Sequence, residues 1–215
     1  MGKELSRDER IILVNKRMTD SQLYILAYQT CCWWQSVFVQ EKRFFDLYYN
    51  NDPNGNDPWE LDETKGVFIA EREFLITSIC NAVKLLERLD KEIQYDDNLS
   101  LVPVINALSE IIPLSEIKTL RNMNVHRIEY MMGGGDKQSD FRSTVTVDDF
   151  LIDTDATITF GIGNKVMFGA VPIHKLLPTM KEQFSTVKMI TNEIFTKASI
   201  AASIKDKSET ETRTE

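Results

Sequence analysis

A single stretch of strand-like alternation, set between long segments of helical periodicity, constrains this chain more than any other feature. Apolar residues recur at three- and four-residue steps in 19–50, 63–93, 101–111, 113–132 and 177–204, which predicts helices. Between the last two, "STVTVDDFLIDTDATITFGIGNKVMFGAVPI" alternates with period two and is rich in Thr, Val, Ile and Phe. We therefore predict a mainly α fold, an antiparallel bundle of four to five helices with a β insertion near 143–173.

The first two helical segments differ in how their apolar residues are distributed. In 19–50, "TDSQLYILAYQTCCWWQSVFVQEKRFFDLYYN", apolar residues cover more than one face, so we expect this helix to be buried on two sides. The "CCWW" run follows the helix period and is interpreted as core packing. In 63–93, Glu and Lys or Arg are assigned to the solvent face of an amphipathic helix.

The β insertion has a turn signal near its end. Ile158, Phe160 and Ile162 alternate with small or polar residues, and Gly163–Asn164 is a favourable two-residue hairpin turn. We predict a β-hairpin, or a small three-stranded meander, that packs on the helices or on a partner because a lone hairpin is marginally stable. The helical bundle with its insertion is expected to be one domain, 1–204, followed by a disordered charged tail, 205–215.

Composition excludes several classes of protein. The formal net charge of -8 argues against broad electrostatic binding to nucleic acid, although it leaves room for a local basic patch. No apolar run reaches the roughly 18 to 20 residues that span a bilayer, so no membrane partner is expected. The polar start favours a cytoplasmic location. The three cysteines lack metal-ligand spacing, and we expect reduced, buried thiols rather than a zinc site.

The candidate functional residues lie in "LRNMNVHRIEY", 120–130, which contains one of the two histidines of the chain. Within one continuous helix, Arg121 and His126 point about 140° apart, whereas Asn122 and His126 share a face. Joint action of Arg121 and His126 therefore requires one of two arrangements. Either the helix bends or begins between them, with Asn122 as its cap, or two chains bring their stretches together around a two-fold axis.

These residue types are sufficient for one reaction. A histidine moves protons near neutral pH, and an arginine holds a phosphate through parallel donors. An asparagine can orient the histidine or donate to a phosphate oxygen. Together they could promote attack of a ribose 2′-hydroxyl on the adjacent phosphate, without any metal or other cofactor. Arg127, with Lys118, adds a small basic footprint for RNA.

The stretch "RNMNVH" resembles the signature of the HEPN superfamily. In that signature an arginine is followed by a polar residue, often asparagine, then by any three residues, and then by a histidine. The resemblance covers about 19–132 and the C-terminal helix. It implies an HEPN-like helical bundle that acts as a homodimer, with Arg121 and His126 catalytic and Asn122 supporting them. Many members are metal-independent endoribonucleases of RNA processing, phage defence or toxin–antitoxin systems, which implies RNA and a protein inhibitor or antitoxin as partners.

One departure from the family and one alternative function accompany this resemblance. The branch paired with nucleotidyltransferase antitoxins often has a tyrosine two residues after the histidine, where this chain has Ile128, and its tyrosine comes later, at Tyr130. Because some members are not nucleases, the alternative is a non-catalytic helical interaction or oligomerisation module. The acidic net charge favours that alternative, since RNA binding usually leaves a basic footprint.

Three other features are interpreted without assigning them chemistry. His174 is expected in a loop or at a strand end, and is not assigned as a second catalytic base. "GGGD" follows a helix, so it is interpreted as a flexible linker and not as a phosphate cradle. The carboxylates of "TVDDFLIDTD" could bind a metal, but acids beside strands are commonly solvated, and no metal site is predicted.

Overall fold

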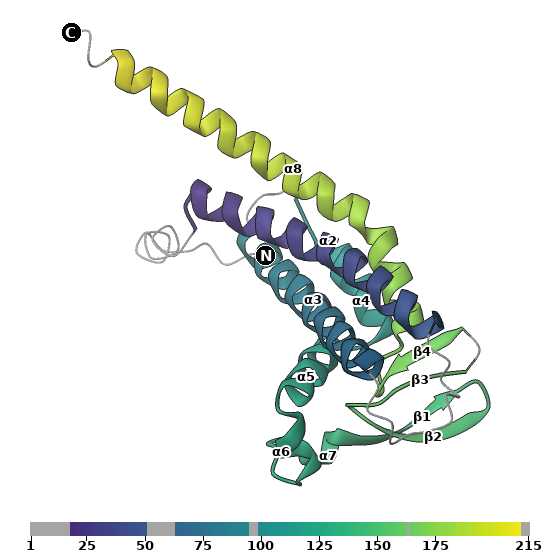
Figure 1. Cartoon of the computed structure of the whole chain (residues 1–215). Coiled ribbons are helices and arrows are strands. Elements are labelled where there is room, and N and C mark those ends of the chain that lie inside the picture. The colour runs from purple at the N-terminus through teal and green to yellow at the C-terminus, as the bar shows by residue number, and fades with distance from the viewer. Residues whose placement is uncertain (1–17, 51–62, 95–98, 163, 212–215) are drawn as a thin grey trace, which may run out of the picture.

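The computed structural model describes residues 18–50, 63–94, 99–162 and 164–211, and it is mainly helical with two small antiparallel hairpins (Figure 1). The mainly α class predicted from the sequence is therefore confirmed. The helices of the described residues are α2 (Asp20–Asn50), α3 (Glu63–Ile93), α4 (Val102–Ile111), α5 (Leu114–Val125), α6 (Arg127–Met131), α7 (Gln138–Phe141) and α8 (Ile173–Glu211).

Helices α2, α3 and α8 form the core of the helical body and run antiparallel to their neighbours. Helix α2 contacts α3 through a hydrogen bond between the Ser36 and Ser78 hydroxyls and through the tilted rings of Phe44 and Phe68, whose centroids lie 5.2 Å apart. On the other flank, the Trp34 indole Nε1–H donates to the Met180 carbonyl of α8 over 3.0 Å. Trp34 is fully buried, so this long-range bond fixes α8 against α2 in a dry environment.

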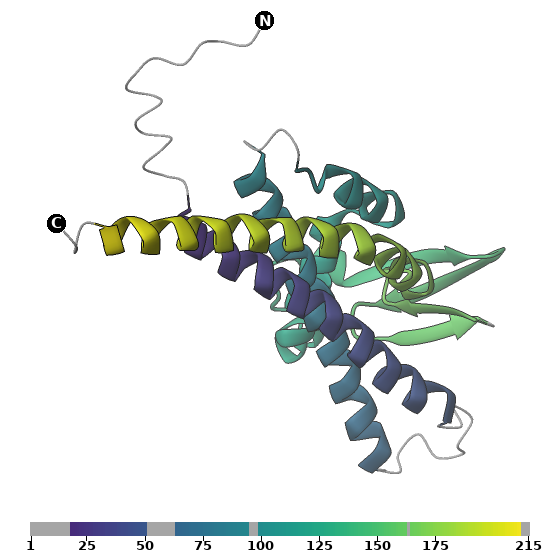
Figure 2. The same ribbon diagram turned by 90° about the horizontal axis from the view of Figure 1, so that it is seen from above.

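Two shorter helices complete the body. Helix α4 packs on α8, and α5 packs on α3 (Figures 1 and 2). The buried face of α5 consists of Leu114, Ile117, Leu120, Met123 and Asn124. Most of this face was expected from the three- and four-residue spacing, and it places α5 so that its last turn lies against the β insertion.

The insertion forms two separate hairpins, which corrects the prediction of a single hairpin or three-stranded meander. Strands β1 (Arg142–Val147) and β2 (Phe150–Asp155) pair in one sheet, and β3 (Thr159–Ile162) and β4 (Lys165–Phe168) pair in another. Ile162 faces Lys165, so the predicted turn position agrees with the register, although Gly163 lies outside the described residues. An ion pair of Lys165 with Asp148 joins the two hairpins.

Helix α8 is longer than its apolar pattern indicated at both ends. It begins at Ile173 rather than at Leu177, which places Pro178 inside the helix. It continues to Glu211, so the segment 205–211 is helical where a disordered tail was predicted (Figure 1). Lys and Glu have high intrinsic helix propensity, and they let a helix continue after its apolar stripe has ended. No helix among the described residues has the length and hydropathy needed to cross a bilayer.

Candidate functional site

The helix that carries the candidate residues is interrupted at His126. The sequence predicted one continuous helix over 113–132, but α5 ends at Val125 and α6 begins at Arg127. His126 has φ -103° and ψ 30°, outside ideal helical values, and its N–H still donates to the Asn122 carbonyl over 3.0 Å. Asn122 lies inside α5, so it does not cap a new helix. Of the two arrangements considered for Arg121 and His126, an interruption of the helix is present, and it lies at the histidine itself.

The interruption turns α6 relative to the apolar stripe of α5. Tyr130 is buried and stacks on Phe141, with ring centroids 5.6 Å apart. Ile128 and Met131, which continue the stripe in a straight helix, are instead 78% and 62% exposed. The Tyr130 ring is buried against α7 in their place, so the three- and four-residue apolar spacing of 113–132 does not correspond to one buried face beyond His126.

His126 and Asn122 share a pocket of about 450 Å³. Both side chains are exposed, and the His126 Nδ1 lies 3.3 Å from a Glu129 carboxylate oxygen. The lining is completed by polar residues of both charges and one aromatic ring: Ser115, Lys118, Thr119, Glu129, Tyr130, Asp136 and Lys137. The pocket thus presents an imidazole, an amide and two lysines to solvent, which are groups that can bind an anionic ligand. It also contains two carboxylates, which repel such a ligand.

The two candidate arginines lie beside the pocket and are not among its lining residues. Arg121 is half-buried, and its Nη1 donates to the Asn122 Oδ1 over a long 3.4 Å. Arg127 is the first residue of α6 and is half-buried. It lies close enough to Arg72 for its charge to lower the pKa of the Arg72 guanidinium. The structure therefore brings Asn122 and His126 together in one pocket, whereas Arg121 and Arg127 flank them in the sequence and do not line it.

A buried arginine that sequence reasoning missed anchors the end of α5. Arg72 of α3 is 3% exposed, and its guanidinium donates to the Asn124 side-chain oxygen and to the Ala156 carbonyl, the latter over 2.9 Å. It also donates to the Thr159 hydroxyl over 2.6 Å, and it lies 5.0 Å from the centre of the Phe168 ring. One side chain thereby joins α3, α5, the link that follows β2 and the second hairpin.

Asn124 completes this network two residues before His126. Its Nδ2 donates to the Ala156 carbonyl over 3.0 Å and to the Leu120 carbonyl over 2.8 Å. Burial lowers the pKa of Arg72 to about 10, and the positive charge of Arg127 adds to this effect. Because that pKa still lies well above neutrality, Arg72 remains charged and is held by neutral oxygens.

The assignment of every charged residue of 63–93 to the solvent face is therefore wrong for Arg72. Its position is in phase with Leu75, Ile76, Ile79 and Val83, all of which are buried. A charged residue at an in-phase core position is a detectable signal in the sequence. Its partners were not detectable, because the Ala156 and Ile158 carbonyls belong to a link between strands whose path the sequence does not specify.

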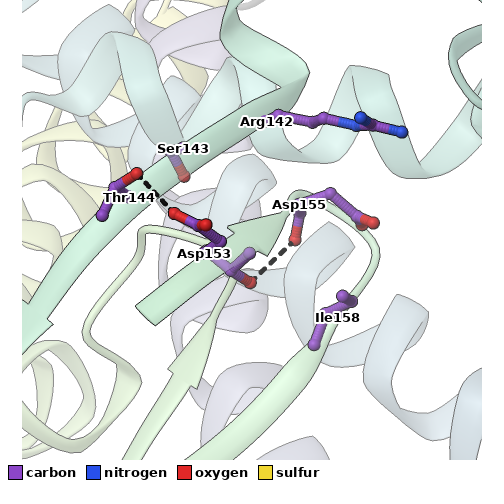
Figure 3. Close-up of a pocket in the computed structure, with 7 residues that line it drawn as sticks. Arg142, Ser143, Thr144, Asp153, Asp155 and Ile158 are labelled. Carbon is purple, nitrogen blue, oxygen red and sulfur yellow. Dashed lines mark hydrogen bonds between the residues drawn. The ribbon is translucent and has the colours of Figure 1, made fainter. Parts of the chain in front are cut away.

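Two further pockets extend from the His126 pocket toward the hairpins. One, of about 440 Å³, shares Ser115, Thr119 and Lys137 with it. The next, of about 460 Å³, lies on the first hairpin and is lined by Arg142, Ser143, Thr144, Asp153, Thr154, Asp155 and Ile158 (Figure 3).

The carboxylates of this hairpin pocket are already engaged within the hairpin. Asp153 accepts from the Thr144 hydroxyl over 2.7 Å, and Asp155 accepts from the backbone and hydroxyl of Thr157. In Figure 3 the Arg142 side chain projects away from Asp153. Within the described ranges, no group of three or more His, Cys, Asp or Glu residues is placed to hold a metal ion.

The second histidine, His174, does not line the His126 pocket and has a different environment. His174 lies in the first turn of α8, not in a loop or at a strand end as predicted, because α8 begins earlier than its stripe. Its Nδ1 lies 3.0 Å from the Val166 carbonyl, a contact that orients the ring against β4. His174 is therefore a structural contact between a helix and a strand, and it serves as a control for His126.

Replacing Gly135 with alanine is expected to destabilise the pocket wall. A Cβ at this position overlaps the ring of Tyr130, including its Cγ at 2.6 Å, and that ring is buried against Phe141. Overpacking of this kind costs about 1–3 kcal/mol in the free energy of unfolding. Urea denaturation measures the loss, and Gly134→Ala is the control because its nearest neighbour is the Glu129 carbonyl at 3.7 Å. Equal stability of the two variants contradicts the expected overlap.

The chain matches no protein-family model, no curated protein and no solved structure. A functional assignment therefore depends on the residues of the His126 pocket and on their geometry.

Proposed function

We propose that this chain is an HEPN-like, metal-independent endoribonuclease that acts as a homodimer. The observation that carries the proposal is the helix interruption at His126, which exposes the imidazole in a pocket shared with Asn122. The motif "RNMNVH" lies at the C-terminal end of α5, the fourth described helix in chain order, and α5 packs on α3. This arrangement supports an HEPN-like bundle in which the two hairpins are an insertion.

His126 has the role of general base in the proposed reaction. It removes the proton of a ribose 2′-hydroxyl, whose oxygen then forms a bond to the adjacent phosphorus while the bond to the 5′-oxygen breaks. The departing oxygen takes a proton from a protonated imidazole, which in a homodimer is supplied by the second copy of the pocket. The products are a 2′,3′-cyclic phosphate and a 5′-hydroxyl, and no metal or cofactor participates.

The charged residues around His126 have the role of holding the phosphate. Arg121 and Arg127 carry permanent charges and are the chain neighbours of the pocket residues Asn122 and His126, and Asn122 offers an amide donor inside the pocket. Donors aimed at developing phosphate charge are usually the largest single contribution to such catalysis. Because neither arginine lines the pocket of its own chain, we assign them to the composite pocket formed when two chains meet.

The surface around His126 supports assembly with a second copy. Val125, Ile128, Met131 and Met132 are 56%, 78%, 62% and 83% exposed, and they are grouped within eight residues at the interruption. Exposed apolar residues grouped in this way mark interaction surfaces. A two-fold axis through this surface brings both histidines to one site, and a protein inhibitor or antitoxin would act by covering the same surface.

A non-catalytic interaction module remains the alternative, and one observation favours it. Glu129 and Asp136 line the same pocket as His126, so a bound phosphate meets two carboxylates there. The net charge of -8 adds to this repulsion at long range. In that case the exposed apolar residues bind a protein, and the pocket has no chemistry.

The experiment that tests the proposal is cleavage of RNA by the purified chain in the presence of a chelator. We expect cleavage that persists without divalent ions, leaves 2′,3′-cyclic phosphate ends and stops when the nucleotide before the cleaved bond is 2′-deoxy. Cleavage that requires a metal ion, or that leaves linear phosphate ends, contradicts the mechanism. Absence of cleavage from a folded dimer favours the interaction module.

A further inference from the structure

A second pocket lies beside the His126 pocket and has a different lining. This side pocket, of about 440 Å³, has a floor of buried apolar residues: Leu120, Met123, Ala156 and Val171. Its rim is polar and carries exposed charges of both signs: Glu116, Lys137, Asp140 and Arg142. Volumes of roughly 300–1,000 Å³, with apolar walls and a small number of polar groups, are typical of sites for small molecules. The side pocket therefore has the build of a ligand site.

The side pocket and the His126 pocket are neighbours on the surface of α5. Thr119 lines both pockets and lies on the border between them. Successive residues of a helix point about 100° apart, so Asn122 lines the His126 pocket and the next residue, Met123, lines the side pocket. Lys137 also lines both, and its Nζ lies 3.4 Å from the Thr119 hydroxyl. The pockets are thus one residue step apart on the helix, a span that a single nucleotide covers.

The lining of the side pocket fits a nucleobase better than it fits a phosphate. A base has two flat faces that pack on apolar side chains, and its edges carry both donors and acceptors. A phosphate has no apolar part to cover Leu120 and Met123, and the rim carboxylates of Glu116 and Asp140 repel it. The same carboxylates are favourable partners for the N–H groups of a base. The charges of both signs on the rim therefore indicate a ligand with donors on one edge and acceptors on another.

Among the four RNA bases, guanine matches this rim most closely. Guanine has two adjacent donors, N1–H and N2–H, on one edge and two adjacent acceptors, O6 and N7, on another. A carboxylate accepts from the donor pair, and an arginine donates to the acceptor pair through two parallel bonds. In the other three bases, donors and acceptors alternate along each edge, so either a carboxylate or an arginine faces a group of the wrong kind. The rim offers both matching groups, in Glu116 and Arg142.

We infer that the side pocket binds a guanine base of the RNA substrate and thereby selects for cleavage after guanosine. The inference rests on the proposed ribonuclease function, because the base belongs to the nucleotide whose 2′-hydroxyl meets His126. Glu116, in the first turn of α5, is assigned to the donor edge, whereas Asp140 accepts from the neighbouring Ser139 hydroxyl over 3.0 Å. Arg142 is assigned to the acceptor edge.

Calorimetric titration with the four nucleoside 3′-monophosphates measures binding without requiring cleavage. The guanosine compound is expected to bind the full chain at least about tenfold more tightly than the other three, which is the usual discrimination of a bidentate contact. Glu116→Gln is expected to remove this preference, because an amide offers one acceptor oxygen in place of two. Glu110→Gln makes the same change at an exposed position of α4 that does not line the pocket, and is expected to keep the preference.

Two base analogues test the two edges separately. Inosine 3′-monophosphate lacks the N2 amino group, and 7-deazaguanosine 3′-monophosphate lacks the N7 acceptor. Each is expected to bind the wild-type chain about tenfold more weakly than the guanosine compound, since each loses one hydrogen bond to a charged side chain. The loss for inosine is expected to shrink to within about twofold in Glu116→Gln, and the loss for 7-deazaguanosine to shrink likewise in Arg142→Met. Losses that are the same in wild type and variants contradict the assigned edges.

Mapping of cleaved ends separates the base site from the nuclease. Cuts are expected to follow guanosine in the wild type and to spread to other bases in Glu116→Gln. His126→Ala is expected to stop cleavage and to keep the guanine preference in binding, because His126 does not line the side pocket. A guanine preference in a chain that cleaves no RNA supports the base site and refutes the nuclease. Cleavage without base preference, or wild-type binding that does not favour guanosine 3′-monophosphate, overturns the guanine site.

Discussion

Replacing His126 with alanine is expected to lower the rate of RNA cleavage by about 100- to 10,000-fold, the usual contribution of a general acid–base residue. The imidazole is exposed at the end of α5, and its Nδ1 lies 3.3 Å from a carboxylate oxygen of Glu129. Its removal therefore leaves the core unchanged, and the loss of rate is expected without a loss of stability. Single-turnover cleavage in chelator measures the rate, and thermal denaturation measures the stability.

The other histidine of the chain provides the matched control. His174→Ala removes a contact with the Val166 carbonyl and leaves the His126 pocket untouched, so we expect cleavage within about twofold of the wild type. Equal activity of wild type and His126→Ala would falsify the assignment of His126 as the base, and would indicate a contaminating nuclease or a different site.

Replacing Arg72 with methionine is expected to lower the free energy of unfolding by about 3 kcal/mol. The change removes charge-assisted hydrogen bonds, each worth about 1.5–3 kcal/mol, and leaves the Asn124 side-chain oxygen buried without its donor. Part of this loss is offset, because methionine fills the space without the desolvation cost of a buried guanidinium. The Ala156 carbonyl keeps its bond from Asn124, which limits the damage to the hairpin link.

Two companion variants separate the network from the charge. Arg88→Met removes an exposed arginine of the same helix, which pairs with Glu92 over 2.7 Å, and is expected to change stability by at most about 0.5 kcal/mol. Arg72→Lys keeps a charge but cannot reach all the oxygens, so it is expected to be no more stable than Arg72→Met. Full stability of the lysine variant, measured by urea denaturation, contradicts the role assigned to the forked guanidinium.

Local patterns in the sequence were sufficient to predict the long helices. The predicted range 63–93 coincides with α3, Glu63–Ile93, and 19–50 differs from α2 by one residue. In both segments the apolar period is sustained over many turns. After 19–50, a run rich in Asn, Asp, Gly and Pro also indicates where the helix ends. The hairpin of β3 and β4 was likewise predicted, because a two-residue turn sets its register.

The candidate site was predicted less completely, because its geometry depends on tertiary contacts. No proline or glycine near His126 indicates in the sequence that the helix is interrupted there. The interruption accompanies the burial of Tyr130 against Phe141. Arg72 reaches the strand link across more than eighty residues of sequence. Contacts over such separations leave no local pattern, so Asn122 and His126 could be named from the sequence while the partners of Arg72, which anchor their helix, could not.

The bond between Trp34 and Met180 joins segments that are 146 residues apart, and it has a consequence for the nascent chain. During synthesis, α2 leaves the ribosome long before the helix that covers its Trp34 face. Until α8 has emerged, a fully buried indole and its apolar neighbours have no partner on that side, and partly made chains expose them to chaperones and to one another. Ribosomes stalled after β4 are therefore expected to display a nascent chain that is sensitive to proteases and becomes resistant only when the last helix is complete.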